Sequence, residues 1–442
     1  MKKLLFLILS LALFTSCERK ISEYAADKGS ANFTSYISVG NSLVAGYADG
    51  ALYHDGQLYS CPNLIAGQLA YAGGGAFVQP MVTSNYGVAV YPGVQPKFVL
   101  GYTADCQGVV GLGPVRSEGA MDPFANVGYA VNNFGIPGAK SFHLIVPGYA
   151  GMNPYYARFA TSLAGAVVQE FGGVHPTFFT MQLGDNDVLA YALAGGSYDS
   201  ITNPQMFYFA MKTVLGALLS TGATGVMANI PDITSIPFFT TIPYNGLVLT
   251  RQSLADSVNY AMSLYQLPFH YVVGQNAFLV KDPTSPHPYF KVRQMVPGEY
   301  VLMTVPQDSL KCMGMGIINV ITHAPYPIPD QYVLTTTEVA KIKFSTDVFN
   351  AMLDTMASNR HIGLVDMNSK LKLLHSQAGI VWDGIHLNAN FVTGGAFSLD
   401  GIHLTPRGNA LSANFFIEAI NQRFGSKIPY VDITKYKGVV FP

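Results

Sequence analysis

The chemistry that this sequence supports centres on Ser42, which follows a short β-prone run ending at Gly40 and Asn41. A serine at the carboxyl end of a parallel strand lies where open α/β sheets bind ligands. If a helix begins just beyond it, the helix N-terminus supplies backbone N–H groups that can bind an oxyanion. The alternative is a serine that only caps a helix, which is a common role for this residue type. Ser42 is therefore a candidate nucleophile.

A base for this nucleophile is offered by the sequence Asp-Gly-Ile-His-Leu, which occurs twice, at 383–387 and at 400–404. Imidazole accepts the proton of a serine hydroxyl near neutral pH. An aspartate bonded to the other ring nitrogen fixes the tautomer and stabilises the imidazolium that forms. Only one of the two copies can serve Ser42.

The residues that follow each copy indicate which one is used. After His403, Thr405 suits an N-cap and Pro406 suits the first helical position, and an apolar stripe at helical spacing follows. After His386 come asparagines and glycines, with no helical pattern. Because a helix packed on a sheet fixes the loop before it, we predict that Asp400 and His403 serve the nucleophile. The first copy is expected in a surface loop near the site.

Two further stretches carry groups that can stabilise an oxyanion. The sequence NFGIPGA at 133–139 follows a predicted strand, and LGDND at 183–187 follows another. Gly138 allows close approach of the backbone, and Asn186 offers a side-chain N–H₂ group just past a buried strand. Taken singly, each of these two residues is better explained as an ordinary turn residue.

In this order, GNSL, NFGIPGA, LGDND and DGIHLTP resemble the four signature blocks of the GDSL/SGNH hydrolases. The resemblance spans residues 36 to about 424. It implies a flavodoxin-like, three-layer α/β/α fold with a central parallel sheet. It also implies hydrolysis of carboxylic esters through an acyl-enzyme, with no cofactor.

The resemblance further assigns roles to individual residues. It implies a catalytic triad of Ser42, His403 and Asp400. It implies an oxyanion hole made of the backbone N–H groups of Ser42 and Gly138 and the side-chain amide of Asn186.

One residue departs from the family pattern. The first block usually has an aspartate where this chain has Asn41. An amide can donate a hydrogen bond where a carboxylate only accepts, so this loop is expected to be held differently. Because the family aspartate is not part of the triad, we expect activity to survive.

The order of the remaining segments predicts an α/β protein. Apolar residues at helical spacing predict helices over 62–72, 154–171 and 204–219, and a buried strand is predicted over 225–230. Strands that alternate with helices indicate a parallel sheet covered on both faces. Proline-rich residues from about 231 to 329 break this rhythm. We interpret them as an insertion in a hydrolase domain over 33–442, either a lid or substrate platform or a purely structural cap.

The composition and the residue spacing argue against a nucleic-acid partner and against a dedicated metal site. The chain has 442 residues, of which 49% are hydrophobic and 12% are charged, with a net charge of -1. This balance is too close to neutral for a nucleic-acid partner. The sequence contains none of the usual zinc or calcium spacings, so no metal site is expected.

The first residues are typical of an export signal. Two lysines, a short apolar run and small residues precede Cys17. This pattern resembles a bacterial lipobox, which implies a signal peptide over 1–17, a lipid on Cys17 and a polar tether over 18–32. The alternative is an ordinary secretory signal. The protein is thus expected outside the cytoplasm, contacting the outer membrane only through its lipid anchor, on the periplasmic or surface side.

The other three cysteines leave two interpretations open. Cys61 and Cys106 lie in one glycine-rich region and can pair in an oxidising compartment. Otherwise Cys61, Cys106 and Cys312 are three separate buried thiols.

Three hypotheses for function follow. The leading one is an exported serine esterase acting on an acylated glycan or lipid. The second is a catalytically silent lipoprotein that binds glycans with the same fold. The third, a lipase or phospholipase, is favoured if the 231–329 insertion is an apolar lid, whereas exposed aromatic residues along a groove favour a carbohydrate esterase.

Overall fold

The computed structural model describes residues 25–442 and is organised around one parallel β-sheet. Its strands lie in the order β17-β8-β7-β1-β6, and every neighbouring pair is parallel. Their bounds are β1 (Tyr36–Gly40), β6 (Asn133–Gly135), β7 (Phe178–Gln182), β8 (Thr224–Ala228) and β17 (Gly363–Val365). All residues of β1, β6 and β7 are buried, as expected for strands covered on both faces. The predicted α/β class with a central parallel sheet is confirmed.

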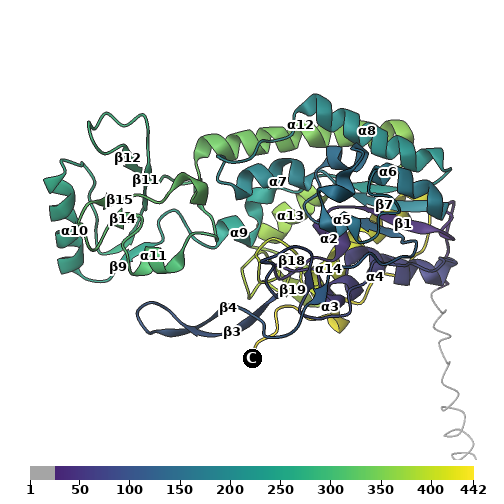
Figure 1. Cartoon of the computed structure of the whole chain (residues 1–442), viewed down its shortest axis with the longest axis horizontal. Helices are drawn as coiled ribbons and strands as arrows, with labels where there is room; N and C mark the ends of the chain where they lie inside the picture. Colours follow the sequence, from purple (N-terminus) through teal and green to yellow (C-terminus); the bar gives the residue numbers. More distant parts are fainter. Residues whose placement is uncertain (1–24) are drawn as a thin grey trace, which may run out of the picture.

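Helices cover both faces of this sheet (Figure 1). One side carries α7 (Asp185–Leu193), α8 (Pro204–Ser220) and α12 (Thr336–Arg360), and α12 contacts each of the other two. The other carries α4 (Cys61–Leu69) and α14 (Pro406–Phe424), which also pack together. Shorter helices complete the body: α2 (Ser42–Ala45), α3 (His54–Leu58), α5 (Pro154–Ala157), α6 (Val167–Glu170) and α13 (Met367–His375).

One predicted helix is wrong in part. The apolar spacing over 154–171 suggested a continuous helix, but the structure has only the short helices α5 and α6, with residues 158–166 between them in non-helical conformation. The carbonyl groups of Ala164 and Gly165 accept the N–H group of Gly148. This bond to another loop replaces the bonds that a continuous helix would need.

The stretch predicted as an insertion forms a lobe beside the sheet (Figure 1). It consists of short antiparallel strand pairs and one longer helix, with two small hydrophobic cores of its own. Its elements are α9 (Pro237–Thr240), β9 (Leu247–Leu249), α10 (Gln252–Leu264), β10 (Gly274–Asn276), β11 (Leu279–Lys281), β12 (Val292–Gln294), β13 (Tyr300–Val301), α11 (Gln307–Lys311), β14 (Ile317–Ile318), β15 (Pro325–Tyr326) and β16 (Val333–Leu334).

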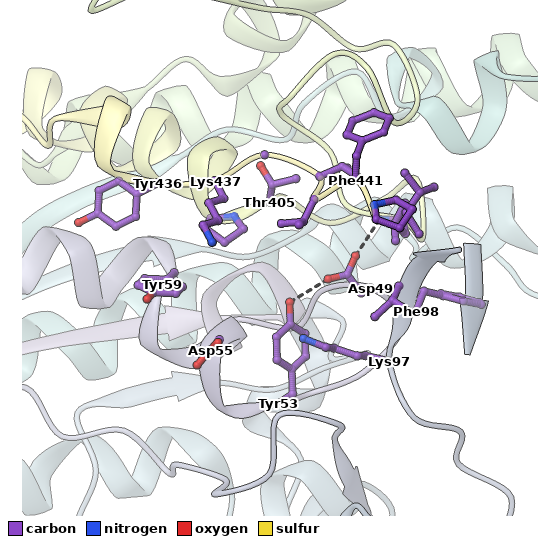
Figure 2. Close-up of a pocket in the computed structure, with 18 of the residues that line it drawn as sticks. Asp49, Tyr53, Asp55, Tyr59, Lys97, Phe98, Thr405, Tyr436, Lys437 and Phe441 are labelled. Carbon is purple, nitrogen blue, oxygen red and sulfur yellow. Dashed lines mark hydrogen bonds between the residues drawn. The ribbon is translucent and has the colours of Figure 1, made fainter. Parts of the chain in front are cut away.

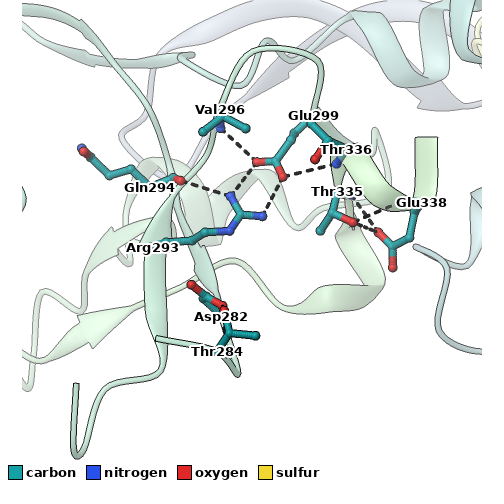
Figure 3. A network of polar contacts seen from close by, with 9 residues as sticks. All are labelled: Asp282, Thr284, Arg293, Gln294, Val296, Glu299, Thr335, Thr336 and Glu338. Carbon is teal, nitrogen blue, oxygen red and sulfur yellow. Dashed lines mark hydrogen bonds and ion pairs between the residues drawn. The ribbon is translucent and has the colours of Figure 1, made fainter. Parts of the chain in front are cut away.

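A buried carboxylate ties this lobe to the start of α12 (Figure 3). The side chain of Glu299 is fully buried and accepts two hydrogen bonds from the guanidinium of Arg293, at 2.8 and 2.6 Å. It also accepts the N–H group of Thr336 at 3.4 Å. Beside it, Thr335 and Glu338 cap α12 reciprocally. A buried charge is tolerated only when it is bonded in this way.

A second projection from the body is the hairpin of β3 (Phe98–Ala104) and β4 (Val110–Arg116). A disulfide between Cys106 at its tip and Cys312 links it to the lobe, and Lys311 pairs with Asp105 at 3.2 Å. Both interpretations of the cysteines are therefore wrong. Cys61 is a free buried thiol at the start of α4, in the body of the protein, whereas Cys106 lies on the hairpin.

Two further strand pairs lie in the body. β2 (Val88–Ala89) pairs with β5 (Asp122–Pro123) in parallel, and β18 (Ile380–Trp382) pairs with β19 (Ile385–Leu387) in an antiparallel hairpin.

The segment predicted as a tether, 18–32, is described from Ala25 onwards, and there it is attached to the body. Asp27 forms a β-bridge with Lys427, and the N–H group of Ser30 donates to the carbonyl of Phe424. The expected signal peptide over 1–17 and the expected lipid on Cys17 lie outside the described residues. Among residues 25–442, no helix has the length and apolar character needed to cross a membrane.

Candidate functional site

Ser42 is the first residue of α2, immediately beyond β1. The strand β1 pairs with β6 on one side and β7 on the other, so its carboxyl end is a topological switch point of the sheet. Two positions beside Ser42 must be glycine because the neighbouring backbone leaves no room for a side chain. A side chain on Gly40 would collide with the carbonyl of Gln182, and one on Gly135 would collide with the backbone of Ala45. These close approaches bring α2 against the sheet edge.

The structure brings His403 and Asp400 to Ser42. The Nε2 atom of His403 lies 2.8 Å from the Oγ atom of Ser42, and its Nδ1 atom lies 2.8 Å from Oδ2 of Asp400. The serine side chain remains partly accessible, whereas the histidine is only 9% exposed. The three groups form the hydrogen-bond chain that a serine nucleophile needs.

Asp400 is held by several donors. Its Oδ2 atom also accepts the N–H group of Gly50 at 3.0 Å, while Oδ1 accepts the Ser398 hydroxyl and the N–H groups of Ile402 and His403. Burial alone would raise the pKa of this carboxyl group. The His403 ring and the hydrogen bonds outweigh it, so the pKa of Asp400 lies well below its ordinary value of 3.8. Asp400 is therefore ionised at neutral pH.

The first Asp-x-x-His copy lies elsewhere in the bonding network. The Nε2 atom of His386 lies 2.8 Å from the carbonyl of Ala378, and Asp383 accepts the N–H group of Ile433 at 3.2 Å. Both residues belong to the β18–β19 hairpin region, and neither is bonded to Ser42. The structure thus places the second copy at the serine.

The segments that carry Gly138 and Asn186 are hydrogen-bonded to each other. The Nδ2 atom of Asn186 donates to the carbonyl of Ala139 at 3.0 Å. The carboxylate of Asp187, on the same helix α7, accepts the N–H and hydroxyl groups of Ser141 at 2.8 and 2.7 Å. Gly138 has a φ of 79° and open space on its Cα.

The sheet register accounts for the meeting of these segments. Gly40 of β1 pairs with Gly135 of β6 and with Gln182 of β7. Ser42, Gly138 and Asn186 follow these three paired positions by two to four residues. The three residues proposed for the oxyanion hole therefore leave the sheet at the same edge.

Asn41 has a partner that the sequence did not reveal. Its Oδ1 atom accepts the N–H group of Leu43 as the cap of α2, and its Nδ2 atom donates to Asp185 at 2.8 Å. Asp185 is buried, and this burial, together with the charge of Asp187, raises its pKa to about 6 despite the bond from Asn41. The amide of Asn41 was the signal in the sequence that could have indicated such a partner, because a buried donor needs an acceptor.

Asp185→Asn is expected to raise stability at neutral pH. A raised pKa in the folded state means that the group's contribution is present below about pH 3.8 and is lost as the pH rises through about 6. The amide does not ionise, so above about pH 6 the substitution should raise the free energy of unfolding by up to about 3 kcal/mol. Denaturant unfolding at pH 4.5 and pH 7.5 measures the difference. The exposed Asp354→Asn is the control, and an equal loss of stability at both pH values for Asp185→Asn would contradict this account.

Other residues of the site also escaped the sequence reasoning. The ring of Tyr47 lies 4.9 Å from the ring of His403. The N–H group of Asp49 donates to Ser398, and its carboxylate accepts the N–H group of Leu399 at 2.9 Å. The polar stretch after Gly46 was visible in the sequence, but its attachment to the Asp400 loop is a contact across about 350 residues of chain.

A cavity of about 460 Å³ has Asp49, Leu399 and Thr405 in its lining (Figure 2). It is enclosed by the loop around Tyr53, the root of the β3–β4 hairpin and the chain end over 435–442. In it, the Nζ atom of Lys97 lies 4.0 Å from the ring centre of Tyr53, whose hydroxyl donates to Asp49. Neither Ser42 nor His403 lines this cavity.

A smaller cavity of about 100 Å³ is mostly apolar. Leu43, which follows the serine, and Ile402, which precedes the histidine, both line it. Within residues 25–442, no group of three or more His, Cys, Asp or Glu side chains is arranged to hold a metal ion.

No protein-family model matches the chain, and no curated protein matches its sequence. Among solved structures, it is similar to LAE5, described as an alpha/beta hydrolase enzyme from the metagenome of Lake Arreo, Spain. The two share 11% sequence identity with a TM-score of 0.35, over 88% of this chain and 96% of that one. A likeness this distant says nothing about the chemistry of the site, which has to be inferred from the geometry above.

Proposed function

We propose that this chain is a serine esterase that cleaves acyl or acetyl esters through an acyl-enzyme. The observation that carries the proposal is the hydrogen-bond chain from Ser42 through His403 to Asp400, with both distances at 2.8 Å. It lies at the carboxyl edge of a parallel sheet, where α/β proteins bind ligands. The order of the blocks and the sheet around them support an SGNH-type hydrolase domain.

In this reaction, His403 takes the hydroxyl proton of Ser42 as Oγ attacks the ester carbonyl carbon. The carbonyl oxygen becomes an oxyanion, which the N–H groups of Ser42 and Gly138 and the amide of Asn186 stabilise. The intermediate collapses, and the leaving alkoxide receives the proton from His403. Water then attacks the acyl-enzyme with the same histidine as base. Asp400 keeps the imidazole in the required tautomer throughout.

The substrate is an ester of a glycan or a lipid, and the protein is exported and anchored through Cys17. Support for export comes from the first 17 residues and from the Cys106–Cys312 disulfide, since such bonds persist in oxidising compartments.

The direct test uses the protein without residues 1–17 and a series of p-nitrophenyl esters from acetyl to long acyl. Turnover is expected, and the preferred chain length separates an acetylesterase from a lipase. A fluorophosphonate probe should label Ser42, as read by peptide mass spectrometry, because the probe reports an activated serine whatever the natural substrate. Absence of both turnover and labelling would refute an esterase.

A further inference from the structure

Arg116, at the end of β4, presents a fixed guanidinium to solvent. Its Cζ atom lies 3.6 Å from the ring centre of Phe98, its cross-strand partner, and its Nη1 atom donates to the carbonyl of Pro96 at 2.8 Å. The side chain is exposed. Within the described part of the chain, no carboxylate lies within ion-pairing distance of it. The cation is thus oriented by an aromatic ring and a carbonyl but is not neutralised.

This guanidinium is connected to the histidine side of the site through Gly50 and Asp400. Its Nη1 atom is 3.2 Å from the point that a Cβ on Gly50 would occupy, so a side chain at this position would crowd the guanidinium. The N–H group of Gly50 donates to Asp400, which bonds to His403. Burial lowers the pKa of Arg116, while the nearby Tyr47 and Asp400 oppose this effect. Both oxygens of Asp400 are already engaged by His403 and other donors, so Asp400 does not pair with Arg116.

The position of Arg116 relative to His403 indicates which half of an ester lies near this arginine. The proposed reaction requires His403 to deliver its proton to the leaving oxygen, so the alcohol half must lie on the histidine side of Ser42. A guanidinium presents a planar fork of donors that matches the oxygens of carboxylate, sulfate or phosphate groups. We infer that Arg116 binds an anionic group on the alcohol half of the substrate. This inference rests on the proposed esterase function and adds an acidic alcohol, such as an acidic sugar, as the substrate class.

The test compares two esters that differ only in charge: 4-acetoxybenzoate, whose alcohol half carries a carboxylate, and methyl 4-acetoxybenzoate, which is neutral. The ratio of kcat/KM for the anionic ester to that for the neutral ester is measured for each protein. Arg116→Gln is expected to lower this ratio by about tenfold, the size of one charge-assisted hydrogen bond at an accessible site. Arg116→Lys should recover part of it. Arg251→Gln, an exposed arginine at the start of α10 with the same loss of charge, should leave the ratio unchanged.

An unchanged ratio in Arg116→Gln, or an equal loss on both esters, would overturn the inference, because the arginine would then act on the triad rather than on the ligand. A preference seen only with an aryl hemisuccinate would place the anion on the acyl half and would overturn the inference as well.

Calorimetric titration with 4-acetamidobenzoate and 4-acetamidobenzamide separates failure of the anion site from failure of the esterase proposal. If neither ester is hydrolysed and the fluorophosphonate probe does not label Ser42, the esterase proposal fails. Carboxylate binding lost in Arg116→Gln would still support the anion site, and equal binding of both compounds would refute it.

Discussion

Ser42→Ala should lower kcat for ester hydrolysis by on the order of 10⁴-fold or more. The alanine removes the only atom in the hydrogen-bond chain that can attack a carbonyl, while His403 and Asp400 remain bonded to each other. Residual turnover should come only from the oxyanion donors and from binding. The measurement is kcat on the preferred p-nitrophenyl ester with enough protein to detect slow rates.

The substitution should leave the fold unchanged, so thermal unfolding serves as the control. Ser42 is partly exposed, and its side chain makes one hydrogen bond, to His403, so thermal unfolding of Ser42→Ala should match the wild type closely. A variant that unfolds normally and keeps more than a few per cent of the wild-type kcat would show that another residue is the nucleophile.

Asp400→Asn is expected to lower kcat by about 10⁴-fold, because an amide favours the wrong tautomer of the histidine and cannot stabilise the imidazolium. The depressed pKa of Asp400 agrees with this role, since the carboxylate is the form that the site stabilises. The sequence provides a matched control. Asp383→Asn makes the same substitution in an identical Asp-Gly-Ile-His-Leu context, where the carboxylate accepts a backbone N–H group of Ile433 instead.

The two variants should therefore differ by several orders of magnitude in kcat. Equal losses would mean that both copies support the site, and a larger loss in Asp383→Asn would reverse the assignment.

Asp400→Asn is also expected to lower stability at neutral pH. A depressed pKa means that the contribution of Asp400 is present above about pH 3.8 and is lost as the pH falls below it. Unfolding of each variant at pH 2.5 and pH 7, on either side of that value, separates this effect from catalysis.

Local sequence signals predicted the elements that position the serine and the histidine. A β-prone run ending in glycine predicted the strand β1, and the helix that was considered beyond it is present as α2. The capping of α14 by Thr405, with Pro406 at its first position, was also predicted. These signals work because caps and buried strands depend on residues only a few positions apart. The same reasoning failed over 154–171, where a bond to a distant loop interrupts the helical pattern.

The contacts between distant segments could be identified only in the folded chain. Cys106 pairs with Cys312, 206 residues away, and Asn41 with Asp185, 144 residues away. The place of Arg116 beside Gly50 likewise depends on how a projecting hairpin packs against the Asp400 loop. Such partners are not encoded by spacing or residue type, because they depend on the register of the sheet and the packing of whole elements. Residue types and their order indicated which residues can do chemistry, and packing sets which charged and polar groups surround them.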